Sequence, residues 1–129
     1  MNKILVEVSV GELLDKISIL EIKKDKIKDT DKLKFINEEY KILKSEFDKN
    51  VKSDVTLDKL FDVLKEINSR LWVIEDDKRQ CEKDKDFGEK FIKLSRDVHF
   101  LNDDRAKIKL EINNHTGSAI KEIKEYSSY

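Results

Sequence analysis

The sequence contains no proline, one cysteine and three glycines in 129 residues. Without proline, only glycines and polar connectors can interrupt a helix, and Gly11, Gly88 and Gly117 fall where the helical pattern begins, changes or ends. Cys81 has no cysteine partner in the chain, which excludes a secreted disulfide scaffold. The length suits one hydrophobic core, so we expect a single domain over residues 1–129.

The chain also lacks an excess of charge of either sign. Its 27 basic and 28 acidic side chains nearly cancel, which removes the positive field that non-specific binding to nucleic acid or to an acidic membrane requires. We therefore expect neither nucleic acid nor a membrane as a partner. The apolar stretch near the N-terminus is interrupted by Glu7 and is too short for a signal peptide or a membrane span. These features predict a cytoplasmic protein.

What the sequence does contain favours helices. Apolar residues make up 38% and charged residues 43%, a balance that suits narrow apolar stripes better than a broad buried sheet face. Apolar side chains recur at steps of three and four, which predicts helices over about 10–28, 31–47, 56–82 and 87–112. Ser9 with Glu12 has the form of a capping box, the cluster Asp29-Thr30-Asp31 can end one helix and cap the next, and the connector Asp54-Val55-Thr56 supplies the cap of the third helix.

The connectors between these stretches are short, which predicts antiparallel neighbours and an all-α, antiparallel bundle of about four helices. The last two helices should form a long hairpin. Residues 3–8 are β-branched and could form a short N-terminal strand, but one strand needs a partner, which another subunit could supply. Residues 120–126 suggest a short tail that docks on the helices.

Two positions on the apolar stripes stand out. Cys81 continues the stripe of the third helix and is therefore expected to be buried and unreactive. Arg105 interrupts the stripe of the fourth helix, where an apolar residue is expected. A guanidinium facing a core is costly unless it is paired, so Arg105 should be at least half buried and bound to a carboxylate, an amide such as Asn68, or an anion. If its role is structural, Arg105→Met should cost little, provided that its partner can reach water.

Only four of the 27 basic residues are arginines, and all lie between positions 70 and 105. Arginine offers a planar fork of donors that lysine cannot reproduce. Antiparallel pairing in the predicted hairpin places side by side residues whose numbers sum to about 173. It thereby predicts a polar layer made of Asn68, Arg70, Trp72, Glu75, Asp76, Arg79, Arg96, Asn102, Asp103 and Arg105.

Two interpretations of this layer remain open. The first is a set of interhelical ion pairs that fix the register of the two helices. In the second, it is an anion or metabolite pocket. The candidate ligand-binding residues are then Arg70, Trp72, Glu75, Arg79, Arg96, Asn102, Asp103 and Arg105, and Glu75 or Asp103 could act as acid–base groups.

The sequence contains no motif that assigns a reaction. No nucleophile, base and orienting acid can be assembled from it, and no glycine-rich phosphate loop is present. His99 and His115 are sixteen residues apart and have no cysteine pair, so neither a zinc site nor a cofactor is expected. Catalytic residues remain unknown, and the sequence leaves open whether the protein is an enzyme.

Three segments carry a resemblance to known proteins: VSVGELLDKISILEIKKDKI, NSRLWVIEDDKRQCE and FIKLSRDVHFLNDDRAKIKLEINNHTGS. They resemble an uncharacterised family of small bacterial and phage-associated proteins, catalogued as a domain of unknown function. Residues 13–23 are similar to the first helix of the helical chorismate mutases, which grip a dicarboxylate with arginines and a lysine. Leu14 stands where that family places its essential arginine, so this second resemblance implies that the arginines of the hairpin would replace it.

These observations predict a helical interaction, assembly or accessory module that forms homo-oligomers through its long helices, with a dimer favoured. Its partner would be another protein or a second copy of the chain. The alternative is a small all-α enzyme or binding protein that acts on an anionic small molecule with an arginine cluster.

Overall fold

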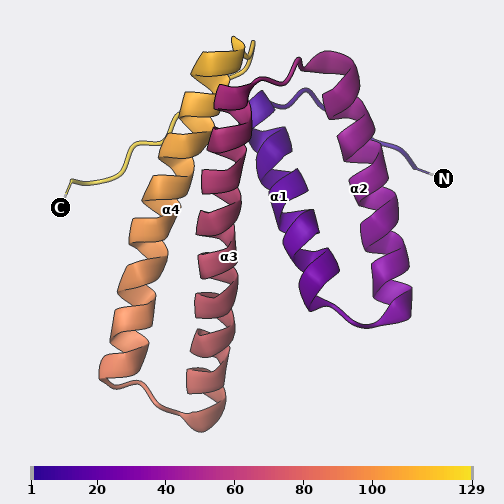
Figure 1. The fold of residues 1–129 in the computed structure, drawn as a ribbon. Coiled ribbons are helices and arrows are strands. Elements are labelled where there is room, and N and C mark those ends of the chain that lie inside the picture. Colours follow the sequence, from indigo (N-terminus) through magenta and orange to yellow (C-terminus); the bar gives the residue numbers. More distant parts are fainter. Residues whose placement is uncertain (1, 129) are drawn as a thin grey trace.

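The computed structural model describes residues 2–128 and consists of four helices (Figure 1). They are α1 (Val10–Lys26), α2 (Thr30–Asn50), α3 (Val55–Asp84) and α4 (Glu89–Thr116). The predicted all-α class and the four predicted helices are confirmed. The fourth helix runs about one turn past its predicted end at residue 112, and its C-cap Gly117 has a φ of 66°, a left-handed conformation that glycine adopts without strain.

The first three helices begin at Ser9 and at the first residues of the two predicted capping segments, 29–31 and 54–56. The side chains of Ser9, Asp29 and Asp54 each accept a hydrogen bond from the backbone N–H three residues later. The capping box at the start of α1 is only half formed, because the carboxylate of Glu12 instead accepts a hydrogen bond from Lys109 Nζ at 2.6 Å. Local sequence signals therefore determine where these helices begin. The one departure is Glu12, whose side chain makes a tertiary contact with Lys109 in place of the expected cap.

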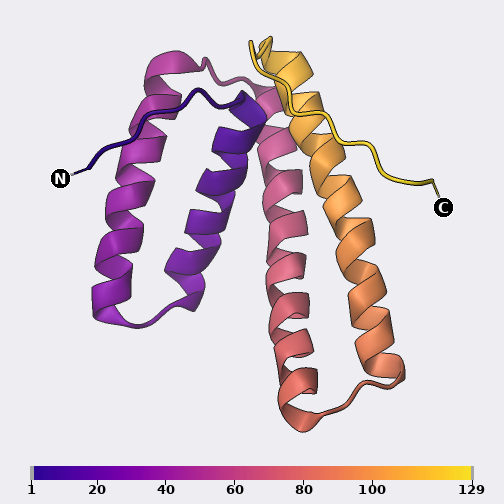
Figure 2. The same ribbon diagram turned by 180° about the vertical axis from the view of Figure 1, so that it is seen from behind.

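The helices form two antiparallel hairpins, α1–α2 and α3–α4, that meet along α1 (Figures 1 and 2). Helix α1 contacts α2, α3 and α4. Of these three helices, α2 packs against α1, while α3 and α4 also pack against each other. The hydrogen bonds that join α1 to the longer hairpin involve Lys65 and Asn68 on α3 and Arg105, Lys109 and Asn113 on α4. Beyond them the α3–α4 hairpin continues past the turn between α1 and α2. We call residues 72–100, at this end, the distal arm.

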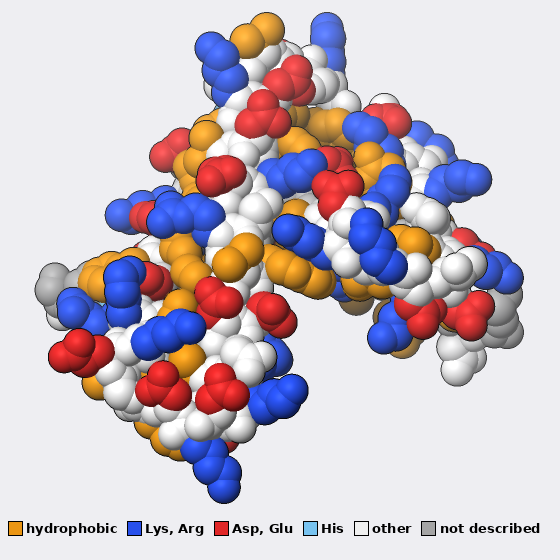
Figure 3. All heavy atoms as spheres, turned by 60° about the horizontal axis from the view of Figure 1, so that its bottom comes forward, with side chains coloured by type: hydrophobic (Ala, Val, Ile, Leu, Met, Phe, Trp, Pro, Cys, Tyr) orange, Lys and Arg blue, Asp and Glu red, His pale blue; other side chains and the backbone are white. Residues whose placement is uncertain are grey.

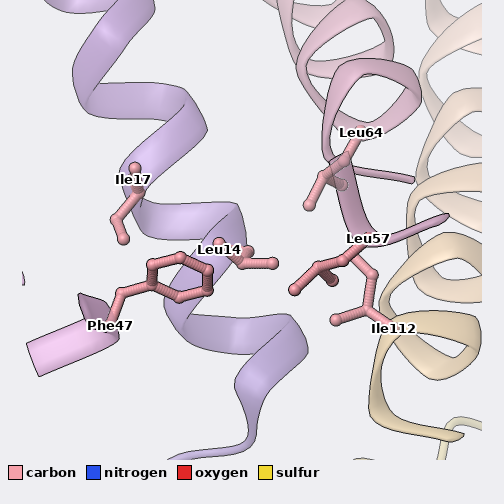
Figure 4. Close-up of a cluster of buried hydrophobic side chains, with 6 residues drawn as sticks. All are labelled: Leu14, Ile17, Phe47, Leu57, Leu64 and Ile112. Carbon is pink, nitrogen blue, oxygen red and sulfur yellow. The ribbon is translucent and has the colours of Figure 1, made fainter. Parts of the chain in front are cut away.

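The main core lies where the two hairpins meet. It contains six buried apolar side chains drawn from all four helices: Leu14, Ile17, Phe47, Leu57, Leu64 and Ile112 (Figure 4). A second cluster of Ile67, Leu71 and Leu101 lies between α3 and α4 alone. Cys81 is 3% exposed, which confirms its predicted burial on the stripe of α3. The core is therefore thick at the base of the long hairpin and thin along the distal arm.

The two terminal segments do not join the helical core. The strand anticipated over residues 3–8 is not formed, and these residues are irregular and exposed, because no other strand lies beside them in the described part of the chain. The C-terminal segment lies against α4, where Ile123 and Tyr126 face Ala106 and Leu110. Within residues 2–128, no helix is both long and apolar enough to cross a membrane.

Helices α1 and α4 approach each other closely at Gly11. Its backbone N–H donates a 2.7 Å hydrogen bond to Asn113 Oδ1, and Asn113 is 1% exposed. A Cβ atom at position 11 would lie 2.5 Å from the carbonyl oxygen of Lys109. Glycine is therefore needed here for close backbone packing and not for an unusual backbone angle.

We expect Gly11→Ala to lower the free energy of unfolding by about 1–3 kcal/mol, because two helix backbones would have to move apart. Gly88→Ala is the matched control, since the nearest atom to a Cβ there is the Asp86 side-chain oxygen at 3.4 Å. Urea unfolding of both variants, followed by circular dichroism, makes the comparison. Equal midpoints for the two variants would show that the α1–α4 contact tolerates a methyl group.

Candidate functional site

The predicted anomaly on α4 is one half of a buried ion pair. Arg105 Nε and Nη2 donate to the two carboxylate oxygens of Asp15 on α1, at 2.9 and 2.5 Å. The Asp15 side chain is 2% exposed and that of Arg105 is 29% exposed. The prediction that Arg105 is at least half buried and bound to a carboxylate, an amide or an anion is confirmed, and its partner is a carboxylate. Asp15 is not predicted as this partner, because the predicted antiparallel pairing applies only to the α3–α4 hairpin, and Asp15 lies on α1.

Two further side chains complete the hydrogen bonding of Asp15. Asn68 Nδ2, from α3, donates to Asp15 Oδ1 at 2.9 Å and to Ser18 Oγ at 2.8 Å. The Ser18 hydroxyl donates in turn to the carbonyl oxygen of Asp15 at 2.7 Å. The predicted closeness of Asn68 to Arg105 is thus realised through their shared carboxylate. Among the described residues, no buried side-chain nitrogen or oxygen lacks a hydrogen-bond partner.

A second cation lies one turn further along α4. Lys109 Nζ lies 2.6 Å from the Glu12 carboxylate on α1 and 3.4 Å from that of Glu122 in the C-terminal segment. The Lys109 side chain is only 11% exposed. This lysine therefore ties the start of α1 and the C-terminal segment to the same turn of α4. We call Glu12, Asp15, Ser18, Asn68, Arg105, Lys109 and Glu122 the polar cluster.

The charges of the polar cluster are paired with one another inside the cluster. Burial alone would raise the pKa of Asp15, but hydrogen bonds from Arg105 and Asn68 and the positive charges of Arg105 and Lys109 bring it below its ordinary value of 3.8. Burial likewise opposes the charge of Lys109, yet Glu12 and Asp15 raise its pKa above the ordinary value. Three carboxylates (Glu12, Asp15, Glu122) and two cations (Arg105, Lys109) leave a net charge of −1. Such a cluster favours holding helices together over binding an anion.

The other predicted site residues lie along the long hairpin. Arg79 Nη1 donates at 3.1 Å to Glu75, four residues earlier in the same helix, and Arg96 lies with its Cζ 5.9 Å from the Phe100 ring centre. The exposed residues of the set are Arg70, Arg79, Arg96 and Asn102, and the half-buried ones are Trp72, Glu75 and Asp103. An anion clamp built from these arginines stays a prediction.

The spacing of three of these residues reveals a shared face. Trp72, Glu75 and Arg79 follow Asn68 by four, seven and eleven residues, so they lie on the side of α3 that contacts α1 at Asn68. Because α1 ends while α3 continues, this face passes from a covered part at the base to the distal arm. Trp72, Glu75 and Arg79 therefore belong to one surface of α3.

A separate pocket of about 260 Å³ lies between α4 and the C-terminal segment. Lys107, Lys109 and Lys124 line it together with Tyr126 and one predicted site residue, Asp103. Within residues 2–128, no group of three or more histidine, cysteine, aspartate or glutamate side chains is arranged to hold a metal ion. Leu14, the position at which helical chorismate mutases carry an arginine, is 4% exposed and packs in the main core.

Comparison with known proteins places the chain in one family. Residues 4–129 match a family of unknown function, DUF6165, and the chain belongs to that family. No curated protein and no solved structure matches the chain. The expected membership of a family without an assigned activity is confirmed, and the geometry described above must carry any functional argument.

The partner of Arg105 changes the expected outcome of its substitution. Asp15 cannot reach water, so the condition under which Arg105→Met would cost little is not met. We expect Arg105→Met to lower the free energy of unfolding by about 3–5 kcal/mol, because it leaves a buried carboxylate unpaired. Arg105→Lys should also destabilise the protein, since an ammonium cannot reach both oxygens in one plane. Urea unfolding measures both effects.

The control for these variants is the double substitution Asp15→Leu/Arg105→Met. It removes both charges and leaves apolar side chains, so it should recover most of the stability that the single substitution loses. A double variant as unstable as Arg105→Met would mean that packing around position 105, and not the unpaired carboxylate, causes the loss.

The lowered pKa of Asp15 predicts a loss of stability in acid. The unfolded chain binds a proton at this carboxylate more tightly than the folded chain does. The stabilisation is therefore present above about pH 4 and is lost as the pH falls through the folded-state pKa. Urea midpoints measured from pH 6 down to pH 2 should fall less steeply below pH 4 in Asp15→Leu/Arg105→Met than in the wild type. Parallel curves would assign the acid sensitivity to other carboxylates.

Proposed function

We propose that the protein is a helical assembly module whose copies dimerise through the distal arm. The observation that carries this proposal is the face of α3 on which Trp72 lies. At Asn68 this face is covered by α1, and four residues later, at Trp72, it continues along an arm built from two helices. A second copy would extend the covering that α1 begins.

The burial of the distal arm supports this proposal. Its stripe residues Ile74, Phe91, Leu94 and Val98 are only partly buried, as is Trp72. Phe87 and Ile92 are 52% and 54% exposed. Hydrophobic side chains remain visible between the charged ones on the long hairpin when its tip is turned forward (Figure 3). A pair of helices buries little surface alone, whereas two such pairs form a four-helix bundle with a complete core.

The charge of the arm favours a second copy as the occupant. Residues 72–98 contain eight acidic and seven basic side chains, so their net charge is 7 − 8 = −1 and the two signs alternate. Two identical surfaces of this kind repel each other weakly and can pair opposite charges across a two-fold axis. The arm also carries Trp72, Arg79 and Phe91. Tryptophan, arginine and phenylalanine are enriched at protein interfaces.

The polar cluster gives the arm a fixed base in this proposal. Asp15, held by Arg105 and Asn68, fixes α1 across α3 and α4, and this sets where the covered face ends. The bidentate geometry resists sliding of one helix along another, because a shift of one residue breaks both hydrogen bonds. Assembly would then proceed from a preformed surface, which lowers its entropic cost.

We expect Trp72→Glu to weaken dimerisation at least about 30-fold, the effect of removing an interfacial tryptophan worth about 2 kcal/mol or more. Light scattering coupled to gel filtration should give the wild type a mass of at least twice the 15.2 kDa of the monomer. The variant should show a smaller mass at the same concentration.

Val73→Glu is the matched control for Trp72→Glu. It introduces the same charge one residue further along the same helix, at a side chain that is 49% exposed and points about 100° away. Its assembly should match that of the wild type, and circular dichroism should show both variants folded. A wild-type protein that is monomeric at micromolar concentration would contradict the proposal.

An anionic small molecule is the alternative occupant, favoured by the exposure of Arg70, Arg79 and Arg96 on the long hairpin. Thermal shift against phosphorylated and dicarboxylate metabolites separates the two functions. A ligand present at one hundred times its Kd would stabilise the protein by about 2.7 kcal/mol, whereas an assembly module would respond to protein concentration instead.

A further inference from the structure

The segment before α1 is rich in apolar residues and irregular, and it pairs with no strand in the described part of the chain. Ile4, Leu5 and Val6 are 85%, 86% and 74% exposed, and Val8 is 42% exposed. Among the described residues, those from 3 to 8 make no backbone–backbone hydrogen bond and belong to no helix or strand. A β-branched segment with free N–H and C=O groups is a template for pairing with another extended chain.

The root of this segment is held firmly by the helical body. Ser9 is 4% exposed and caps α1, Val10 N–H donates to Ser118 Oγ at 3.1 Å, and Gly11 N–H donates to Asn113. The six residues that follow outward therefore leave the molecule from a fixed point. A fixed root reduces the entropy that the segment loses when it pairs.

The sequence of the segment is complementary to itself in one antiparallel register. When two copies cross at Leu5, Lys3 of each lies opposite Glu7 of the other, and Ile4 lies opposite Val6. Opposite charges and apolar pairs at directly facing positions stabilise antiparallel strands. Side chains alternate between faces, so Ile4, Val6 and Val8 form one fully apolar face.

We propose that residues 3–8 form an antiparallel β-ribbon with the same residues of a second copy, centred on Leu5. This inference rests on the proposed assembly function, to which it adds a second interface on a different part of the molecule. The two-fold symmetry of the register is the reason for choosing a second copy over an unrelated strand, because the Lys3–Glu7 pair then forms twice. An arm dimer has two such segments, so the ribbon joins dimers into larger even-numbered assemblies.

Position-specific cross-linking tests the ribbon and its register. In a Cys81→Ala background, Leu5→Cys places the two thiols at directly opposed positions, where Cα atoms are about 4.5–5.5 Å apart and a disulfide can form. Val8→Cys is the matched control, because in this register the two Val8 positions are about 20 Å apart. Mild oxidation should give covalent dimers of Leu5→Cys at least about ten times faster than of Val8→Cys.

Equal cross-linking rates at the two positions, or none at position 5, would overturn the ribbon. Repeating the experiment in a Trp72→Glu background separates this inference from the proposed function. Cross-linking at position 5 should persist there, and its loss would show that the ribbon is no independent interface. Failure of the arm proposal has a different signature, since Trp72→Glu would then leave the mass of the assembly unchanged while Leu5→Cys still cross-linked.

Discussion

The buried carboxylate of Asp15 is the constraint on which the arrangement of the two hairpins depends. A charged group that is 2% exposed costs several kcal/mol unless its oxygens are paired and hydrogen-bonded. Asp15 obtains its partners from α3 and α4 together, through Asn68 and Arg105. Helix α1 must therefore lie where both helices can reach it, and apolar packing alone would allow many other positions along the same stripe.

The remaining contacts of α1 follow from that position. With Asp15 fixed, the first turn of α1 meets α4 closely enough that only glycine fits at position 11 beside the Lys109 carbonyl. Glu12 then reaches Lys109, which also binds Glu122 and so holds the C-terminal segment against α4. A single polar contact thus organises the helix crossing, the close backbone approach and the path of the C-terminal segment.

The sequence predicts most of the local structure because those signals are local. Caps at Ser9, Asp29 and Asp54 act within one turn, and apolar spacing of three and four residues defines each buried stripe. Arg105 could be recognised as a buried, paired residue for the same reason, since it breaks such a stripe. Its partner could not, because the crossing of α1 over α3 and α4 joins residues 90 positions apart.

A signal for that partner is nevertheless present in α1. The buried positions Gly11, Asp15, Ser18 and Ile22 recur at steps of four, three and four residues, so Asp15 is a charged residue on a buried face of α1, just as Arg105 is on α4. Opposite charges that break two different apolar stripes satisfy each other only if they meet. The pairing of such interruptions predicts a long-range contact that helix periodicity alone does not provide.

The polar cluster and the exposed apolar surfaces differ in whether their side chains already have partners within the chain. In the cluster, the guanidinium of Arg105 is held by Asp15 and the ammonium of Lys109 by Glu12 and Glu122, so a ligand would have to break charge-assisted hydrogen bonds to enter. On the distal arm and along residues 3–8, by contrast, apolar side chains are exposed to water. Covering these side chains lowers the free energy of the system. The two proposed interfaces lie on those surfaces, while Asp15, Arg105 and Lys109 join the helices that carry them.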